Sequence, residues 1–182
     1  MPRVASSAKR KSNSKSKRGR TTVIKEVTGD ILLSQAQAIA HGIAPNDHFN
    51  SGLALSLREE WPAMYQDFRH YCHANHPKPG EVWAWGGASG KRIISLFTQE
   101  PPLNHQGNPG HATVHNVNLA LRELRHLIEK ENFTSIALPR LATGVGGLDW
   151  EEVLPLVKKQ LGDLKIPVYV YSTYRKGVQA EE

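Results

Sequence analysis

The chain has 182 residues, a length that suits one domain with a sizeable core, and its longest apolar runs are too short to span a membrane. The formal net charge is +6, but residues 1–20 hold eight Lys/Arg and no acidic residue, so the rest of the chain has a net charge of −2. Because this Ser-rich basic segment cannot bury enough apolar surface to offset its ordering entropy, we expect residues 1–21 to form a disordered arm. The arm is either a salt-sensitive contact for nucleic acid or a solvated tail.

The cellular compartment is predicted from two features of the chain. The N-terminus lacks the apolar core of a signal peptide, and Cys72 is the only cysteine. Disulfides within the chain are therefore excluded, and a reducing environment fits. We expect a cytoplasmic monomer that does not contact membranes, with the nucleus as the alternative in a eukaryote.

The first half of the chain predicts two strands followed by two helices. Alternating apolar residues predict a strand over 22–27, and an apolar run predicts a buried strand over 37–43. Apolar residues at helical steps then run from Leu53 to Tyr71, and Pro62 interrupts them. We expect two short helices with Pro62 in the first turn of the second.

The second half alternates strands and helices. Two strands over 81–85 and 92–97 flank a Gly-rich turn, and they are followed by a helix, a strand, a helix and a strand over 111–131, 135–139, 149–161 and 168–171. This alternation predicts an α/β fold, a three-layer α/β/α sandwich with a mixed central sheet. The domain is expected over 22–174, with a C-terminal tail over 175–182.

The run 135–150 carries the strongest functional signal. A strand ends at Pro139, a loop of small residues and glycines follows, and Asp149 opens a helix. Glycines let backbone N–H groups approach a phosphate closely, although an ordinary strand-to-helix turn has the same composition. The loop matches neither the Walker sequence nor the GxGxxG fingerprint. In such folds ligands bind at the carboxyl ends of strands, where we expect the loops 28–31, 41–52 and 140–147 to meet.

Three motifs in this order resemble a macrodomain, the fold that binds ADP-ribose: Val27–Ile31, Ala38–Ile43 and Pro139–Trp150. The resemblance covers roughly residues 22–174. It is nearest to the branch of the terminal ADP-ribose glycohydrolases and of the bacterial antitoxins that remove ADP-ribose from DNA thymidine. The ending Gly146–Trp150 is similar to the DNA-directed members in particular.

The resemblance implies two ends of a ligand site. At the purine end, Asp30 would accept a hydrogen bond from the adenine amino group, the backbone of Ile31 would hold the base, and Tyr171 would stack on it. The alternatives are an N-cap or turn role for Asp30 and a lid on the core for Tyr171. The diphosphate would be wrapped by the loop Ala142, Thr143, Gly144, Val145 and Gly146. Ser51 and Gly52 would face it from a helix N-terminus.

The sequence departs from that branch at several positions. Phe49–Gly52 replaces a Gly-rich stretch near the distal ribose, which points to a different preferred ligand. Gln99 stands where the glycohydrolases have a lysine nucleophile, and an amide cannot form a Schiff base, unless Lys91 or another lysine reaches in. Gly146 replaces the aspartate of protein-directed members and matches the DNA-directed ones.

Two residues remain as candidates for catalysis. His41 ends an apolar strand at the ligand loop, where some ADP-ribose-1″-phosphate phosphatases of this fold also have histidine, and an imidazole can move a proton. Asp47, with His48 beside it, could orient a water. The plainer interpretations are a histidine satisfied by backbone groups and a solvated loop.

The histidines and the cysteine over 70–76 have spacings that permit zinc, but no distant ligand pair is evident and a polar helix end explains them better. We expect neither a metal nor a cofactor. The predicted function is binding of ADP-ribose or a derivative and hydrolysis of an ADP-ribose adduct: a 1″-phosphate, an O-acyl group or a nucleobase linkage. The alternatives are a reader of ADP-ribose without turnover and a nucleic-acid-binding protein that acts through the arm.

Overall fold

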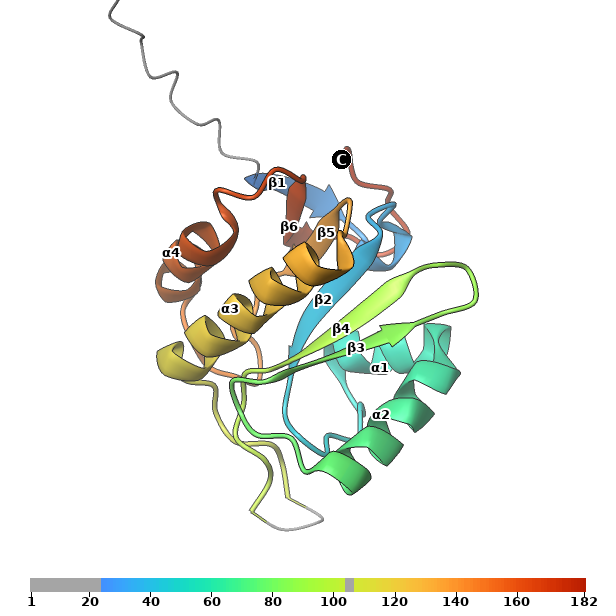
Figure 1. Cartoon of the computed structure of the whole chain (residues 1–182), viewed down its shortest axis with the longest axis vertical. Coiled ribbons are helices and arrows are strands. Elements are labelled where there is room, and N and C mark those ends of the chain that lie inside the picture. Colours follow the sequence, from blue (N-terminus) through green and yellow to red (C-terminus); the bar gives the residue numbers. More distant parts are fainter. Residues whose placement is uncertain (1–23, 104–106) are drawn as a thin grey trace, which may run out of the picture.

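The computed structural model describes residues 24–103 and 107–182, which build one six-stranded sheet covered by helices on both faces (Figure 1). The order across the sheet is β1-β6-β5-β2-β4-β3. All neighbouring strands are parallel except β3 and β4, which form an antiparallel hairpin. The mixed sheet of the predicted sandwich is confirmed. The strands are β1 (Ile24–Gly29), β2 (Ala38–Ile43), β3 (Val82–Gly86), β4 (Arg92–Phe97), β5 (Ile136–Pro139) and β6 (Val168–Tyr174).

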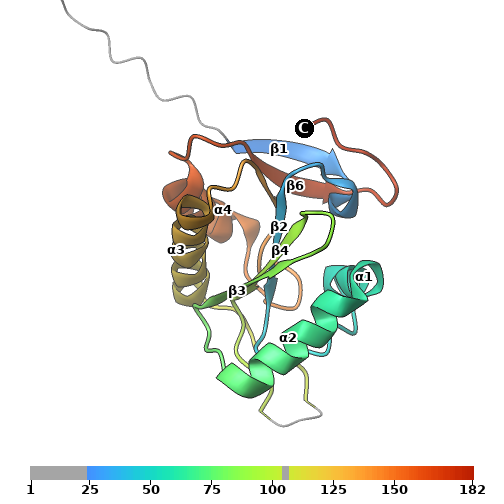
Figure 2. The same cartoon turned by 45° about the vertical axis from the view of Figure 1, so that its right-hand side comes forward.

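The helices form the two outer layers (Figure 2). One face carries α3 (Val114–Glu131) and α4 (Trp150–Leu161), and the other carries α1 (Gly52–Glu60), α2 (Pro62–Asn75) and the short 3-10 helix η1 (Ile31–Leu33). Successive strand residues point to opposite faces, so Ala38 and Ala40 pack towards α3 while Ile39 packs towards α2. The central strands are therefore buried on both sides, as parallel strands usually are.

The element boundaries agree with the predictions except at a few ends. Pro62 is the first residue of α2, as expected. The helix predicted from residue 111 begins at Val114, because Thr113 caps it by accepting a hydrogen bond from the Asn116 amide. Strand β6 continues to Tyr174 beyond its predicted end, because its last residues keep pairing with Thr28 and Gly29.

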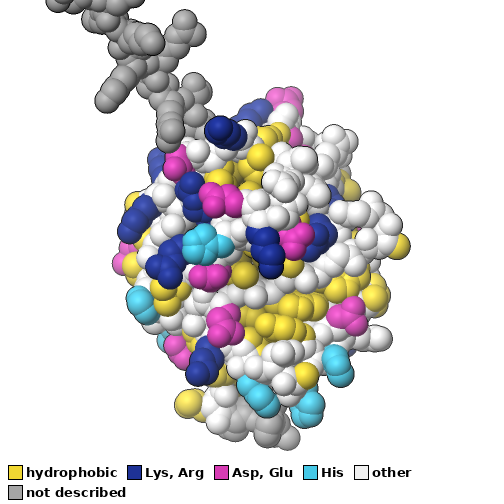
Figure 3. Space-filling model, viewed as in Figure 1, with side chains coloured by type: hydrophobic (Ala, Val, Ile, Leu, Met, Phe, Trp, Pro, Cys, Tyr) yellow, Lys and Arg dark blue, Asp and Glu magenta, His cyan; other side chains and the backbone are white. Residues whose placement is uncertain are grey.

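The parallel strands place the carboxyl ends of β1, β2, β5 and β6 at the same edge of the sheet. The three loops predicted to meet follow these strands. On the face shown in Figure 3, basic and acidic side chains are interspersed over the layer of α3 and α4. The predicted basic arm lies outside the described residues. Within the described ranges, no helix combines the length and the apolar character that a membrane span requires.

Candidate functional site

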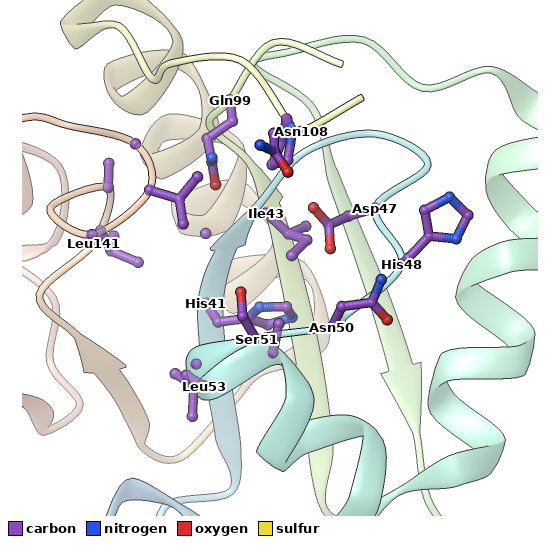
Figure 4. A pocket seen from close by; sticks show the side chains of 18 of the residues that line it. His41, Ile43, Asp47, His48, Asn50, Ser51, Leu53, Gln99, Asn108 and Leu141 are labelled. Atoms are coloured by element: carbon purple, nitrogen blue, oxygen red, sulfur yellow. The ribbon is translucent and has the colours of Figure 1, made fainter. Parts of the chain in front are cut away.

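A cavity of about 850 Å³ opens at this carboxyl edge, between the loops that follow β2, β4 and β5 (Figure 4). Its volume is in the range of small-molecule sites. Most of the residues proposed from the sequence line it: His41, Asp47, Ser51, Gly52, Ala142, Gly144, Val145 and Gly146. Asp30, Ile31, Thr143 and Tyr171 are not among the lining residues.

The loop after β5 brings backbone amides without an acceptor in the described chain to the cavity wall. Ala142 adopts a left-handed conformation with φ 61°, and the amides of Gly147 and Leu148 close the loop on the carbonyls of Gly144 and Ala142. Among the described residues, none accepts a hydrogen bond from the amides of Gly144, Val145 or Gly146. These three amides, which we call the amide nest, form the kind of concavity that binds anions.

Gly146 is required by packing. A Cβ atom at this position would lie 2.6 Å from the carbonyl oxygen of Ala142 and 3.0 Å from the Cβ of Ala112. The aspartate of protein-directed members could not occupy this position without a backbone shift. A Cβ at Gly144 would have no atom within 4 Å, so Gly144 and Gly146 differ sharply in the space around them.

The wall opposite the nest is the N-terminus of α1. Ser51 is its N-cap residue with an extended backbone and no side-chain capping bond, so the first-turn amides stay available to a ligand. The nest and the positive end of this helix together supply N–H donors from two sides of the cavity, an arrangement that favours a bound anion.

Phe49 explains how the chain replaces the expected Gly-rich stretch. Its backbone is left-handed, with φ 54°, and its ring is completely buried, in contact with the rings of His41, Tyr65 and Phe68. The bulky side chain therefore points into the core and anchors the loop. The other three residues of this segment, Asn50, Ser51 and Gly52, line the cavity.

Asp30 lies at the same sheet edge but outside the cavity. Its Oδ1 accepts the Leu32 amide at 3.1 Å and caps η1, which confirms the N-cap alternative, and its Oδ2 accepts the Gly177 amide at 2.9 Å. Only β6 separates β1, which Asp30 follows, from β5, which leads to the nest. Two strand spacings amount to about 10 Å, so one nucleotide can reach both.

Tyr171 is placed as a lid on the core. It is 5% exposed, and its hydroxyl donates to Glu182 at 3.0 Å. Burial, the largest cause, raises the pKa of Tyr171 to about 12. Tyr174 is the exposed aromatic at this edge: it is 58% exposed and pairs with Gly29, the neighbour of Asp30. Tyr174 was not predicted as a site residue, because the strand expected from the sequence ended at Tyr171, three residues earlier.

His41 forms part of the cavity floor and is otherwise enclosed by the core. It is 2% exposed, its Nε2 lies 3.1 Å from the Ser95 hydroxyl, and its ring forms a T-shaped pair with Phe49. Burial lowers the pKa of His41 to about 4, so the imidazole is neutral at neutral pH. Because so little of the imidazole is exposed and its pKa is low, His41 is poorly suited to take a proton from a ligand or a water.

Asp47 lines the cavity with a carboxyl group that is partly withdrawn from water. Burial raises the pKa of its carboxyl group, opposed by the hydrogen bond from the Phe49 amide and by the charges of His48 and Arg69. One oxygen accepts the Phe49 amide at 2.7 Å. Figure 4 shows Asp47, Gln99 and Asn108 projecting towards the same part of the cavity.

Lys91 does not compensate for Gln99, so this possibility from the sequence is corrected. The Lys91 ammonium donates to the carbonyls of Ser34 at 2.7 Å and Ala36 at 2.6 Å, at the start of β4. Gln99 lies beyond the other end of that strand, where its Nε2 donates to the Gly110 carbonyl at 3.2 Å. The six residues of β4 put about 20 Å between the two positions.

A metal site is not formed at the histidines and the cysteine of α2. Among the described residues, no three His, Cys, Asp or Glu side chains are grouped so that they could hold a metal ion. Cys72 is buried, and burial raises the pKa of its thiol.

Comparisons with known proteins agree with this geometry. The family model described as Macro domain matches residues 44–157. A DNA ADP-ribosyl transferase-DNA ADP-ribosyl glycohydrolase fusion protein of Thermosipho africanus is 26% identical over 166 residues, covering 84% of this chain and 42% of the relative. The chain therefore spans less than half the length of that relative.

Two solved structures share the fold. The macrodomain of Thermus aquaticus DarG has a TM-score of 0.71 and 24% identity, covering 82% of this chain and 97% of its own. Thermosipho africanus DarTG in complex with ADP-ribose also has a TM-score of 0.71, with 20% identity and coverage of 86% and 42%. Since the family model spans more than half of the residues and the site lies where its loops meet, this chain belongs to the macrodomain family.

Proposed function

We propose that this chain binds ADP-ribose and hydrolyses ADP-ribose adducts. The observation that carries the proposal is the amide nest at Gly144–Gly146, which faces the N-terminus of α1 across the cavity. A diphosphate between them would satisfy donors on both sides, and it would take up the favourable potential of the helix end.

The two ends of the nucleotide extend from that point in opposite directions. The purine lies towards Asp30, where the carboxylate accepts the amino group and Tyr174 offers a stacking surface. The distal ribose lies towards Asp47, Asn50 and Gln99, which line the far part of the cavity. This orientation places the anomeric carbon beside the carboxylate with the raised pKa.

The proposed reaction is a single displacement by water. Asp47 takes a proton from the water, the water oxygen bonds to the anomeric carbon, and the bond to the adduct breaks with its electron pair going to the leaving group. Gln99 cannot form a covalent adduct, and no lysine is among the described residues that line the cavity, so the proposed reaction uses no lysine intermediate. His41, neutral and bonded to Ser95, supports the floor of the site.

Nucleobase-linked ADP-ribose is the favoured substrate among the three adduct classes. The full-length Thermosipho africanus relative is named a DNA ADP-ribosyl glycohydrolase fusion protein. The packing around Gly146 excludes the aspartate that protein-directed members carry. The 1″-phosphate and the O-acyl ester remain the alternatives that a parallel assay compares.

Binding is tested by calorimetric titration with ADP-ribose. We expect a single site in the wild-type chain and a dissociation constant at least tenfold higher in Asp30→Ala, because a charge-assisted hydrogen bond contributes about 1.5–3 kcal/mol. Absence of heat at millimolar ADP-ribose in the wild-type chain would remove the proposed function.

Turnover is tested with ADP-ribosylated DNA, O-acetyl-ADP-ribose and ADP-ribose-1″-phosphate in parallel. Asp47→Asn should lower kcat by roughly 10²–10⁴ while the dissociation constant of ADP-ribose changes little, since a general base contributes that factor. Asp67→Asn is the matched control, because Asp67 of α2 is exposed, accepts a hydrogen bond from Trp85 of β3 and does not line the cavity. Equal kcat values for Asp47→Asn and the wild type would refute the assignment, and no turnover of any substrate would favour a reader.

The basic residues 1–20 suggest a second interaction, with nucleic acid. Eight positive charges without an acidic residue fit a salt-dependent contact to phosphates. Deleting residues 1–20 should abolish retention on DNA at low salt and leave the affinity for ADP-ribose unchanged. Equal DNA retention by the shortened chain would assign that contact to another surface.

A further inference from the structure

The purine end of the site is covered by residues of the same chain. The Gly177 amide donates to Oδ2 of Asp30 at 2.9 Å, and the Asp30 amide donates to the Val178 carbonyl at 2.7 Å. Ala180 is 7% exposed and belongs to the apolar cluster that also contains Ile31. The segment Gly177–Glu182, which we call the latch, therefore lies directly against the carboxylate assigned to the purine.

This contact closes the route to Asp30. Each of its two carboxylate oxygens already accepts a backbone amide, and the residue is 6% exposed. The cavity extends to Pro139 and Arg140 but includes neither Asp30 nor Ile31 among its lining residues. A purine amino group can reach the carboxylate only if the turn around Gly177 moves away.

The far end of the latch is held largely by one side chain. The carboxylate of Glu182 accepts hydrogen bonds from the Ser34 hydroxyl at 2.6 Å, the Gln35 amide at 2.8 Å and the Tyr171 hydroxyl at 3.0 Å. The charge of Lys91 also acts on Glu182. In the middle of the latch, Gln179 donates to the Leu33 carbonyl at 2.9 Å.

We propose that the latch is an autoinhibitory element that occupies the purine subsite and must be released before the nucleotide binds in full. The proposal rests on the purine assignment of Asp30 in the proposed function. The apparent dissociation constant is the intrinsic constant divided by the fraction of open molecules, so weakening the latch tightens binding until the open form dominates.

The test compares full-length variants by calorimetry with ADP-ribose. Glu182→Ala removes three accepted hydrogen bonds and should lower the apparent dissociation constant roughly five- to tenfold. Glu181→Ala is the matched control, since it removes the same charge from an exposed neighbouring residue. Gln179→Ala, which removes a separate contact, should shift affinity in the same direction, and it replaces Glu182→Ala if that variant does not fold.

Hydrogen exchange gives a readout of the latch itself. The Gly177 amide should exchange faster in Glu182→Ala than in Glu181→Ala without ligand, and faster in the wild-type chain once ADP-ribose is saturating. Equal affinities in all variants, or slower exchange at Gly177 on binding, would overturn the latch while the proposed function stands. No binding by any variant would overturn the proposed function and the latch together.

Discussion

Replacing Gly146 by alanine tests the packing of the loop on which the proposed site depends. The added Cβ would sit 2.6 Å from the carbonyl oxygen of Ala142 and 2.9 Å from its Cα. Both contacts are with backbone, which cannot rotate away as a side chain would. Overpacking of this kind costs about 1–3 kcal/mol. Replacing glycine also lowers the conformational entropy of the unfolded chain, which raises the free energy of unfolding by about 0.4–1 kcal/mol.

Gly144→Ala separates these two effects. It brings the same change in the unfolded chain, but the new Cβ meets no atom within 4 Å. The difference in free energy of unfolding between the two variants is therefore the steric cost, about 1–3 kcal/mol. For a domain of this size that corresponds to a Tm difference of roughly 2–12 °C.

Thermal and urea unfolding measure the stability difference, and calorimetry with ADP-ribose measures its effect on the site. A backbone shift at residue 146 moves the amide nest, so Gly146→Ala should also bind ADP-ribose at least tenfold more weakly than the wild type. Gly146→Ala with the stability of Gly144→Ala and the affinity of the wild type would refute the reasoning.

Three further predictions follow from burial and exposure. Burial lowers the pKa of His41 to about 4 from 6.5. The stability that the neutral imidazole contributes is therefore complete above pH 6.5, and up to about 3 kcal/mol of it is lost as the pH falls towards 4. Urea unfolding at several pH values should show that the free energy of unfolding falls less with acid in His41→Asn than in the wild type, and the same pH dependence in both would contradict this. Phe49 is completely buried against three rings. Phe49→Ala should therefore lower the free energy of unfolding, measured with urea, by about 3–5 kcal/mol. A decrease below about 1 kcal/mol would show that the ring does not anchor the loop. Tyr174→Ala should weaken the binding of ADP-ribose roughly two- to tenfold, because the ring offers a stacking surface. The Tm should not change, since the ring is 58% exposed. An unchanged affinity in calorimetry would exclude stacking on Tyr174.

The layer architecture was predictable from local patterns. Alternating apolar residues, continuous apolar runs and helical steps mark the strands and the α-helices, and Pro62 marks the break between two helices because it lacks an amide for the helix ladder. The Gly-rich loop after β5 was also predictable, since its glycines are local in sequence, and the amides of Gly144 and Gly146 have no acceptor among the described residues. Boundaries shifted where a cap or a pairing partner distant in sequence decided them, as at Thr113 and Tyr174.

The state of the candidate site could be read only from the folded chain. Whether His41 is exposed or sealed beside Ser95, and whether Tyr171 faces a ligand or Glu182, depends on which surfaces meet between strands and helices far apart in sequence. The sequence by itself determined the α/β layers, the Gly-rich loop after β5 and the carboxylate at the end of β1. Tertiary structure alone decided that this carboxylate is covered by residues almost 150 positions away, because burial and hydrogen bonding arise from packing that no local pattern encodes.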